Sequence, residues 1–200
     1  MARQNIRKRK LRKGIAVLGD GRTEQYYLQH LKQIKGYKYA IKPSLFDCIN
    51  LKQAEDIIDD LIDNEYGLII FFTDYDTIIN QGRQADFDAL RKKYKGSTQV
   101  IICESMPSIE YWFLLHFVKT TREFINADQV HRELLKHLGS YSKKIKELGK
   151  PEWVKELCDN NRMENAILNA TDILQQKLEN EGGNHFPFTK AHKGINKFEE

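Results

Sequence analysis

Four acidic residues have the types and spacing for metal-dependent chemistry. Asp20 and Glu24 lie four positions apart, Asp74 and Asp76 form a DxD pair, and each cluster follows a short apolar run. If both runs are strands of one parallel sheet, their carboxyl ends bring the two clusters together. Carboxylates gathered in this way repel one another unless a divalent cation binds them, and Mg²⁺ (or Mn²⁺) accepts carboxylate and phosphate oxygens. The sequence therefore predicts a Mg²⁺ or Mn²⁺ site for phosphoryl-transfer chemistry, with all four acids as metal ligands.

The elements that must position these acids alternate between strands and helices. Apolar runs predict strands at 14–18, 39–46, 67–72 and 99–103. Amphipathic segments predict helices at 23–35, 51–65 and 86–94. Thr23 is the expected N-cap of the first helix. This alternation is typical of an α/β fold with a mainly parallel sheet flanked by helices.

Beyond Pro107, which suits the first turn of a helix, the pattern becomes helical. Further helices are predicted at 127–138, 141–148 and 161–179. An exposed polar tail is expected after Gly183. The length favours one domain with an appended lobe, in three regions: a basic N-terminal arm at 1–13, an α/β core at 14–120 and a helical C-terminal region at 121–200 that packs on the core.

The basic character of the chain is concentrated in the arm. The chain has 32 Lys and Arg against 28 Asp and Glu, and residues 1–13 hold seven of the basic residues and no acid. The rest, with 25 basic and 28 acidic residues, has a net charge of −3. Such an arm either contacts nucleic-acid phosphates or is a solubilising tail.

The composition also bears on compartment. No apolar stretch approaches the roughly 18 residues of a membrane span, and no signal peptide follows the basic start, so we expect a cytoplasmic protein without membrane contact. Cys48, Cys103 and Cys158 are widely spaced and have no zinc-ligand pattern. Buried, reduced thiols are expected.

Several motifs resemble those of the RloB-like family, whose core is a divergent Toprim domain. The most distinctive is SMPSIEYWFLLHF at 105–117, and GDGRTE at 19–24 and DYD at 74–76 are shared with many Toprim proteins. Weaker similarities are YSK at 141–143 and PFTKAH at 187–192. The family usually has Glu where this chain has Asp20, so ligation by this shorter carboxylate is expected to be weaker or indirect.

The resemblance implies a Toprim-like α/β core and a nuclease that acts on DNA or on RNA, including tRNA. It also implies a bacterial, restriction-linked system of phage defence by abortive infection. An ABC-class or AAA-class ATPase encoded nearby is the expected partner. The residues expected to carry catalysis are Glu24, Asp74, Asp76, Glu110 and Lys143.

Glu110 and Lys143 have other interpretations. A carboxylate in the first turn of a helix is favoured by the helix dipole alone, and Lys143, followed by Lys144 and Lys146, fits a solvated helix face as well as a phosphate contact. For His116, which lies beside Leu and Phe, a structural role is favoured over a role in proton transfer. Ser105 is expected in a loop or cap, and Lys190 and His192 in the exposed tail.

Two rival functions remain open from the sequence. The segment FFTDYDT at 71–77 matches the hhhDxDxT pattern of haloacid-dehalogenase-type phosphatases, although in those proteins this motif normally opens the domain and here an acidic loop precedes it. A non-catalytic nucleic-acid-binding or ATPase-docking module with degenerate acidic loops is the second. A DxD glycosyltransferase is a more distant option.

Overall fold

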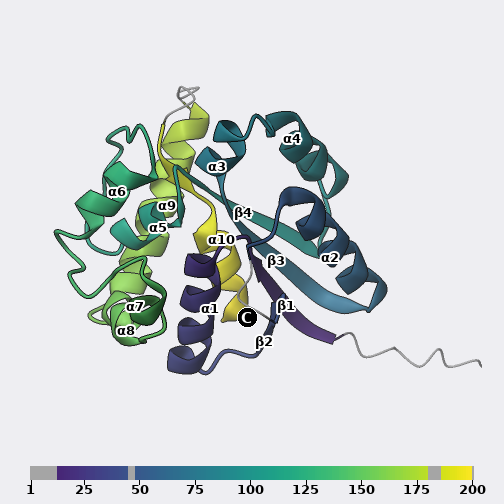
Figure 1. Ribbon diagram of the computed structural model, residues 1–200, viewed down its shortest axis with the longest axis horizontal. Coiled ribbons are helices and arrows are strands. Elements are labelled where there is room, and N and C mark those ends of the chain that lie inside the picture. The colour runs from purple at the N-terminus through teal and green to yellow at the C-terminus, as the bar shows by residue number, and fades with distance from the viewer. Residues whose placement is uncertain (1–12, 45–47, 180–185, 200) are drawn as a thin grey trace, which may run out of the picture.

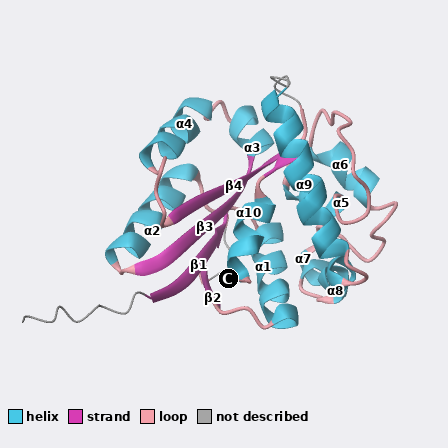
Figure 2. Ribbon diagram, turned by 180° about the vertical axis from the view of Figure 1, so that it is seen from behind, coloured by secondary structure: helices cyan, strands magenta, loops and turns pink. Residues whose placement is uncertain are grey.

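A five-stranded sheet carries helices on both faces (Figures 1 and 2). The computed structural model describes residues 13–44, 48–179 and 186–199, so the predicted arm lies, apart from Lys13, outside the described residues. The strands are β1 (Lys13–Gly19), β2 (Tyr39–Lys42), β3 (Tyr66–Asp74), β4 (Val100–Met106) and β5 (Phe188–Thr189). Their order is β2-β1-β3-β4-β5, with β5 antiparallel to β4 and the other pairs parallel. The predicted α/β fold with a mainly parallel sheet is confirmed.

The central strand β3 shows why both faces of the sheet are covered. Ile69 and Phe71 belong to one buried cluster and Ile70 and Phe72 to another, because successive side chains of a strand point to opposite faces. Burying such a side chain contributes about 1.5–3 kcal/mol. The first cluster includes residues of α2 (Leu51–Asp63) and α4 (Gln84–Lys93). The second includes residues of α1 (Arg22–Lys35) and α10 (Ala191–Ile195).

Most of the remaining helices extend this second core. Trp112 and Trp153 are buried there, and the Trp112 indole N–H donates to the Tyr27 hydroxyl of α1 at 2.9 Å. The elements are α5 (Ile109–Leu114), α6 (Ala127–Leu134), α7 (Ile145–Leu148), α8 (Glu152–Cys158) and α9 (Arg162–Glu179). The short α3 (Tyr75–Asn80) directly follows β3, and a 3₁₀ turn, η1 (Asn196–Phe198), follows α10.

Several predicted boundaries differ from the structure. The N-cap of α1 is Gly21 instead of Thr23, and its backbone is extended with no side-chain cap. The helices expected at 127–138 and 141–148 are shorter, and α3 and α8 were not predicted because six or seven residues carry little periodicity. Of the strand expected at 39–46, only Tyr39–Lys42 is a strand, and residues 45–47 lie outside the described residues.

The segment 186–199 corrects the expectation of an exposed polar tail. Phe188 is buried in β5, and Ala191 and Ile195 are buried in α10. Gly194 allows this contact, because a Cβ atom there would lie 2.8 Å from Ile70 Cγ2. The last part of the chain therefore adds a strand to the sheet and closes the second core.

Two further findings concern compartment and thiols. Among the described residues, no helix combines the length and apolar character needed to cross a membrane. The three cysteines are unpaired, but only Cys103 is buried: Cys158 is half-buried and Cys48 is exposed, contrary to expectation. Cys48 sits in the connection before α2, which places it at the surface.

Candidate functional site

A cavity of about 520 Å³ lies at the carboxyl ends of β1 and β3, where the acidic clusters were expected to meet. Of the predicted site residues, five line it together: Asp20, Glu24, Asp74, Glu110 and Lys143. Asp76 does not belong to the lining. The parallel topology explains the convergence, because residues that end adjacent parallel strands share one edge of the sheet.

Asp20 is fixed between β1 and β3. Its Oδ2 accepts a hydrogen bond from Thr73 Oγ1 at 2.5 Å and one from the Asp74 backbone N–H at 3.3 Å. Its own backbone N–H donates to the Phe72 carbonyl, which holds the loop against β3. Removal from solvent raises the pKa of the Asp20 carboxyl to about 6, against the lowering effect of these hydrogen bonds. The Asp20 backbone N–H also acts on the carboxyl to lower its pKa, whereas the hydrogen bonds from Thr73 and Asp74 both reach Oδ2.

Glu24 lies in the first turn of α1, folded back against the loop that precedes it. A Cβ atom on Gly21 would lie 2.7 Å from Glu24 Oε2, and one on Gly19 would lie 2.6 Å from Glu24 Cβ. A side chain at Gly19 would thus collide with the Cβ atom of Glu24, and one at Gly21 would displace the Glu24 carboxylate. Burial, followed by repulsion from Asp20, raises the pKa of Glu24 to about 8. Among the described residues, the hydrogen bond to its carboxyl group comes from its own backbone N–H, which acts to lower the pKa.

Asp74 ends β3 and lies beside the start of α5. Its Oδ1 accepts a hydrogen bond from the Ile109 backbone N–H at 2.7 Å. Burial raises the pKa of Asp74 well above its ordinary value, and the carboxylates of Glu24 and Asp20 raise it further. Asp74 is therefore the member of the cluster on which repulsion from the other two converges.

Asp76 turns toward the C-terminal helices. Its Oδ2 accepts from the Ala127 backbone N–H at 3.2 Å, at the start of α6, and its Oδ1 accepts from the Thr77 hydroxyl at 3.4 Å. Burial raises its pKa. These contacts give Asp76 a part in joining α3 to α6, and its role as a metal ligand stays a prediction.

Glu110 differs from the other cavity acids because its charge is matched. Its Oε1 accepts from Tyr141 Oη and pairs with Lys143 Nζ, both at 2.8 Å, and its Oε2 accepts from Ser108 Oγ at 2.6 Å. Burial acts to raise the pKa of Glu110, but Lys143, Ser108 and Tyr141 outweigh it and hold it below its ordinary value. The segments 105–117 and 141–143 thus meet at one ion pair.

Lys143 reaches the cavity from the loop before α7, not from a helix face. Burial acts to lower its pKa, but Glu110, Asp74 and Glu24 outweigh this effect and raise it, so its ammonium stays charged. Lys144 and Lys146 are exposed and do not line the cavity. Lys143 therefore lines the cavity while Lys144 and Lys146 lie at the surface, and its contact with phosphate stays a prediction.

The other residues singled out from the sequence have structural contacts. His116 is buried, one of its ring nitrogens, Nδ1, is 2.9 Å from the Trp112 carbonyl oxygen, and burial lowers its pKa to about 4. Ser105 lies in β4 and not in the expected loop or cap, and its hydroxyl is hydrogen-bonded to the Thr189 hydroxyl at 2.8 Å, which ties β4 to β5. His192 is buried, with its pKa lowered to about 4. None of these three residues lines the cavity.

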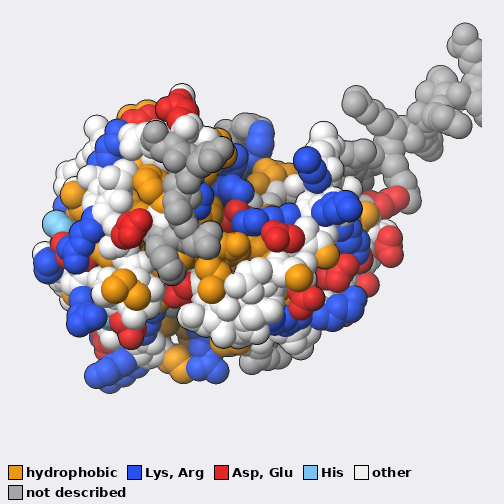
Figure 3. All heavy atoms as spheres, turned by 90° about the horizontal axis from the view of Figure 1, so that it is seen from above, with side chains coloured by type: hydrophobic (Ala, Val, Ile, Leu, Met, Phe, Trp, Pro, Cys, Tyr) orange, Lys and Arg blue, Asp and Glu red, His pale blue; other side chains and the backbone are white. Residues whose placement is uncertain are grey.

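Lys190 belongs to an ion-pair cluster separate from the cavity. It pairs with the buried Glu104 at 2.6 Å, and Arg91 pairs with the same carboxylate. On the face drawn in Figure 3, basic and acidic side chains of the described residues are interspersed. Any phosphate contact there would thus depend on local groups instead of a broad basic surface.

Sequence reasoning missed most of the residues that surround the acids. Thr73, Ser108 and Tyr141 position Asp20 and Glu110 from other segments, and no local pattern connects them. The pair Asn50 and Gln53 had a detectable signal, because an Asn followed three residues later by Gln before an apolar run indicates a capping box. Both side chains line the cavity, together with Arg22, Thr77 and Gln81.

The carboxylates fit a divalent cation of a particular kind. Among the described residues, no group of three or more His, Cys, Asp or Glu side chains is arranged to hold a metal ion by itself. Mg²⁺ is commonly held by one or two carboxylates and completes its shell with waters and substrate phosphates. Burial, and for Glu24 also repulsion from Asp20, raises the pKa values of both carboxyl groups, and a bound cation would offset this cost. The donor set thus suits an open site, not a closed cage of protein ligands.

Comparison with known proteins places the chain in a family. The family model described as RloB-like protein matches residues 15–198, which include every motif in the cavity wall. No curated protein and no solved structure matches the chain. Because the match extends over nearly the whole length, this chain belongs to the RloB-like family.

Proposed function

We propose that this chain is a Mg²⁺- or Mn²⁺-dependent nuclease that hydrolyses phosphodiester bonds of DNA or RNA. The observation that supports it most strongly is the convergence of Asp20, Glu24 and Asp74 on one cavity with raised pKa values. Structural acids are usually paired with cations, as Glu110 is with Lys143, whereas no ion pair of the described residues includes Asp20, Glu24 or Asp74. Three carboxylates kept together against their mutual repulsion indicate a site for a cation.

The residues of the cavity have separable roles in this proposal. Asp20 and Glu24 hold the cation, and Asp74 completes the negative field around it. A bound divalent ion would polarise the scissile phosphate and lower the pKa of a water. Glu24, with a pKa of about 8, would have to give up its proton to hold a cation. Lys143 donates to a phosphate oxygen, and Glu110 keeps its ammonium in place at 2.8 Å.

The biological setting we propose follows from the family. RloB-like membership supports a part in bacterial phage defence and an ABC-class or AAA-class ATPase as partner, as the sequence motifs implied. The arm at 1–13, with seven basic residues, is the segment we propose for sequence-independent contact with phosphates. The defence role with its ATPase partner and the phosphate contact of the arm both extend the nuclease proposal, and the nuclease proposal does not depend on either.

One observation favours a second candidate, a non-catalytic nucleic-acid-binding module. The described residues contain no ready-made three-ligand metal group. Such a module would bind nucleic acid equally well with and without Mn²⁺, whereas an open metal site gains affinity from the ion.

The test is a cleavage assay on a substrate panel. The full chain is incubated with end-labelled single-stranded DNA, duplex DNA, single-stranded RNA and folded RNA, in Mn²⁺, in Mg²⁺ and in EDTA. We expect the chain to cleave at least one of these substrates. EDTA should abolish this cleavage, and the double variant Asp20→Asn, Glu24→Gln should not cleave. Metal-independent binding without cleavage of any substrate would instead support the second candidate.

A further inference from the structure

The cavity has two parts with different chemistry. Beside the carboxylates, its wall continues over the start of α2, β3 and the second half of α3 up to its C-cap, with apolar residues and residues that carry side-chain amides. The apolar residues are Ile49, Leu51, Phe71 and Ile78, and the amides are Asn50, Gln53 and Gln81. An apolar wall with a few fixed polar groups suits a heteroaromatic ring, whereas a phosphate needs charge and donors.

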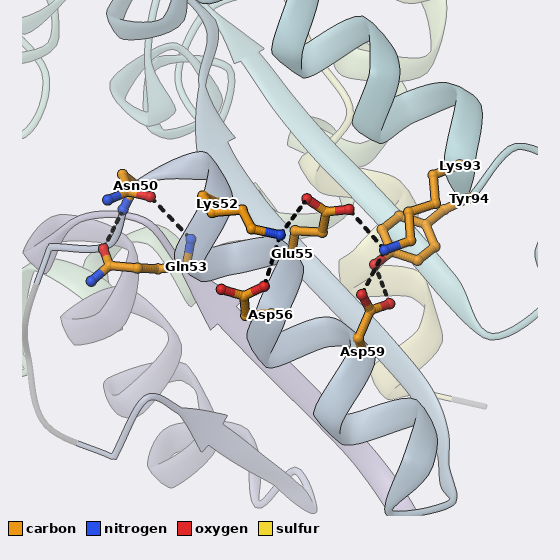
Figure 4. A network of polar contacts seen from close by, with 8 residues as sticks. All are labelled: Asn50, Lys52, Gln53, Glu55, Asp56, Asp59, Lys93 and Tyr94. Carbon is orange, nitrogen blue, oxygen red and sulfur yellow. Dashed lines mark hydrogen bonds and ion pairs between the residues drawn. The ribbon is translucent and has the colours of Figure 1, made fainter.

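The capping box of α2 gives two of these amides a fixed orientation. Asn50 Oδ1 accepts from the Gln53 backbone N–H at 3.0 Å, and Gln53 Oε1 accepts from the Asn50 backbone N–H at 2.9 Å. Each carboxamide oxygen is therefore engaged with the backbone, and each amino group remains as a donor. Figure 4 shows both amino groups on the same side, directed away from α2. They form a pair of pre-positioned donors at the wall of the cavity.

The size of the cavity fits this use. Its volume of about 520 Å³ lies within the range of roughly 300–1,000 Å³ that is usual for small-molecule sites. A nucleotide can place its phosphate at the carboxylates and its base along α2 within one such space. A base inside a duplex cannot enter, because it must first leave the stack.

We propose that the α2 side of the cavity is a pocket for one unstacked nucleobase, read by the Asn50 and Gln53 amino groups. This inference rests on the proposed function and narrows its substrate class to DNA or RNA that presents an unpaired nucleotide. Ring nitrogens and carbonyl oxygens of the base accept from the two amino groups, while Ile49, Leu51 and Ile78 contact the ring. The helix start contributes through its carboxamides, which only the capping box holds in place.

The chain offers variants that change the donors and keep the helix start. Asp replaces Asn at an N-cap, and Glu replaces Gln in a capping box, without loss of the cap. Asn50→Asp and Gln53→Glu therefore keep α2 folded but replace an amino donor by a carboxylate oxygen. Lys52→Gln is the matched control, because it makes the same change of one charge unit on the same helix at a residue outside this cavity.

The experiment measures binding of the full chain to a fluorescent single strand in Ca²⁺, by anisotropy. A second set of strands carries one abasic position each, which removes a base and keeps every phosphate. We expect wild type and Lys52→Gln to lose about tenfold in affinity at one abasic position, the size of one or two lost hydrogen bonds. Asn50→Asp and Gln53→Glu should bind intact strands about tenfold more weakly and show no further loss at that position.

The outcomes separate the pocket from the nuclease. If wild type is insensitive to every abasic position, or if both donor variants keep the full abasic loss with unchanged melting temperatures, the base pocket is wrong. Metal-dependent cleavage measured in parallel decides the proposed function independently. Equal cleavage of fully paired duplex and of single strands would also overturn the pocket while leaving the nuclease intact.

Discussion

Two groups of acidic side chains in this molecule have opposite surroundings. Glu55, Asp56 and Asp59 on α2 lie toward solvent and pair with lysines (Figure 4). Lys93 Nζ is 2.8 Å from Glu55 Oε1, and Lys52 Nζ is 3.0 Å from Asp56 Oδ1. The hydrogen bond from Lys93 lowers the pKa of Glu55. These acids are balanced by the chain itself.

The cavity acids Asp20, Glu24 and Asp74 form no comparable ion pairs with lysines among the described residues. They face one another, and withdrawal from solvent raises the pKa of all three. Burial thus raises the pKa of Glu24, whereas a lysine lowers the pKa of Glu55, so one residue type is shifted in opposite directions in the two groups. The presence of acids therefore does not identify a site, whereas several acids buried together without ion pairs of their own indicate one.

The largest effect should come from removing a charge in the cavity. Asp74→Asn takes away the carboxylate on which the repulsion of Glu24 and Asp20 converges and should lower the metal-dependent cleavage rate by on the order of 10²–10³-fold. Glu55→Gln removes an acid from the balanced group and should leave the rate unchanged. If Asp74→Asn cleaved at the wild-type rate, the cavity acids would not differ in function from the lysine-paired acids of α2.

The next effect is the pH dependence of metal affinity. Glu24, with a pKa of about 8, must release a proton to bind a cation, so apparent Mn²⁺ affinity should rise from pH 6 to pH 8 by up to about tenfold per pH unit. Titration calorimetry at several pH values measures it. Glu24→Gln should weaken binding and flatten the rise, and a pH-independent affinity in wild type would contradict the assigned role.

The same pKa shift predicts the stability of the metal-free chain. Folding raises the pKa of Glu24 from 4.5 to about 8, so the folded state retains a proton that the unfolded state releases. Stability should therefore fall as pH rises between these values, and the melting temperature should decrease from pH 5 to pH 8. Mn²⁺ should restore more stability at pH 8 than at pH 5. Glu24→Gln should show a shallower pH dependence in the same thermal scans.

A smaller effect should follow from crowding the loop. Gly21→Ala places a Cβ atom 2.7 Å from Glu24 Oε2 and should displace this carboxylate, weakening Mn²⁺ binding by about tenfold. Gly139→Ala is the control, because no atom lies within 4 Å of the added Cβ. Equal Mn²⁺ affinities for the two variants would show that the position of Glu24 does not matter.

The smallest effect is expected at the balanced group. Lys93→Ala breaks exposed ion pairs to Glu55 and Asp59 and should lower the free energy of unfolding by about 1 kcal/mol or less. Mn²⁺ affinity should not change. A gain of a second Mn²⁺ site in this variant would show that pairing with lysine is what keeps the α2 acids from binding metal.

The sequence predicted the sheet and the meeting of its acids because both depend on local patterns and on one general rule of parallel sheets. Apolar runs marked β1 and β3, and their ends placed Asp20 and Asp74 at one edge. The hydrogen bond from Tyr141 to Glu110 could not be predicted from a local pattern, since the two residues are 31 positions apart in the chain. Asp76 shares the DxD motif with Asp74 but turns to Ala127, a direction that tertiary packing decides. β5 and α10 could not be predicted, because segments this short, with Phe188 and Ala191 among their few apolar residues, carry no clear periodicity.

The most direct test of a cation site is an anomalous difference map from crystals soaked in Mn²⁺. We predict a peak in the cavity between Asp20, Glu24 and Asp74, absent in Glu24→Ala, and no peak beside Glu55, Asp56 and Asp59. A map without density among the cavity carboxylates at saturating Mn²⁺ would contradict the account.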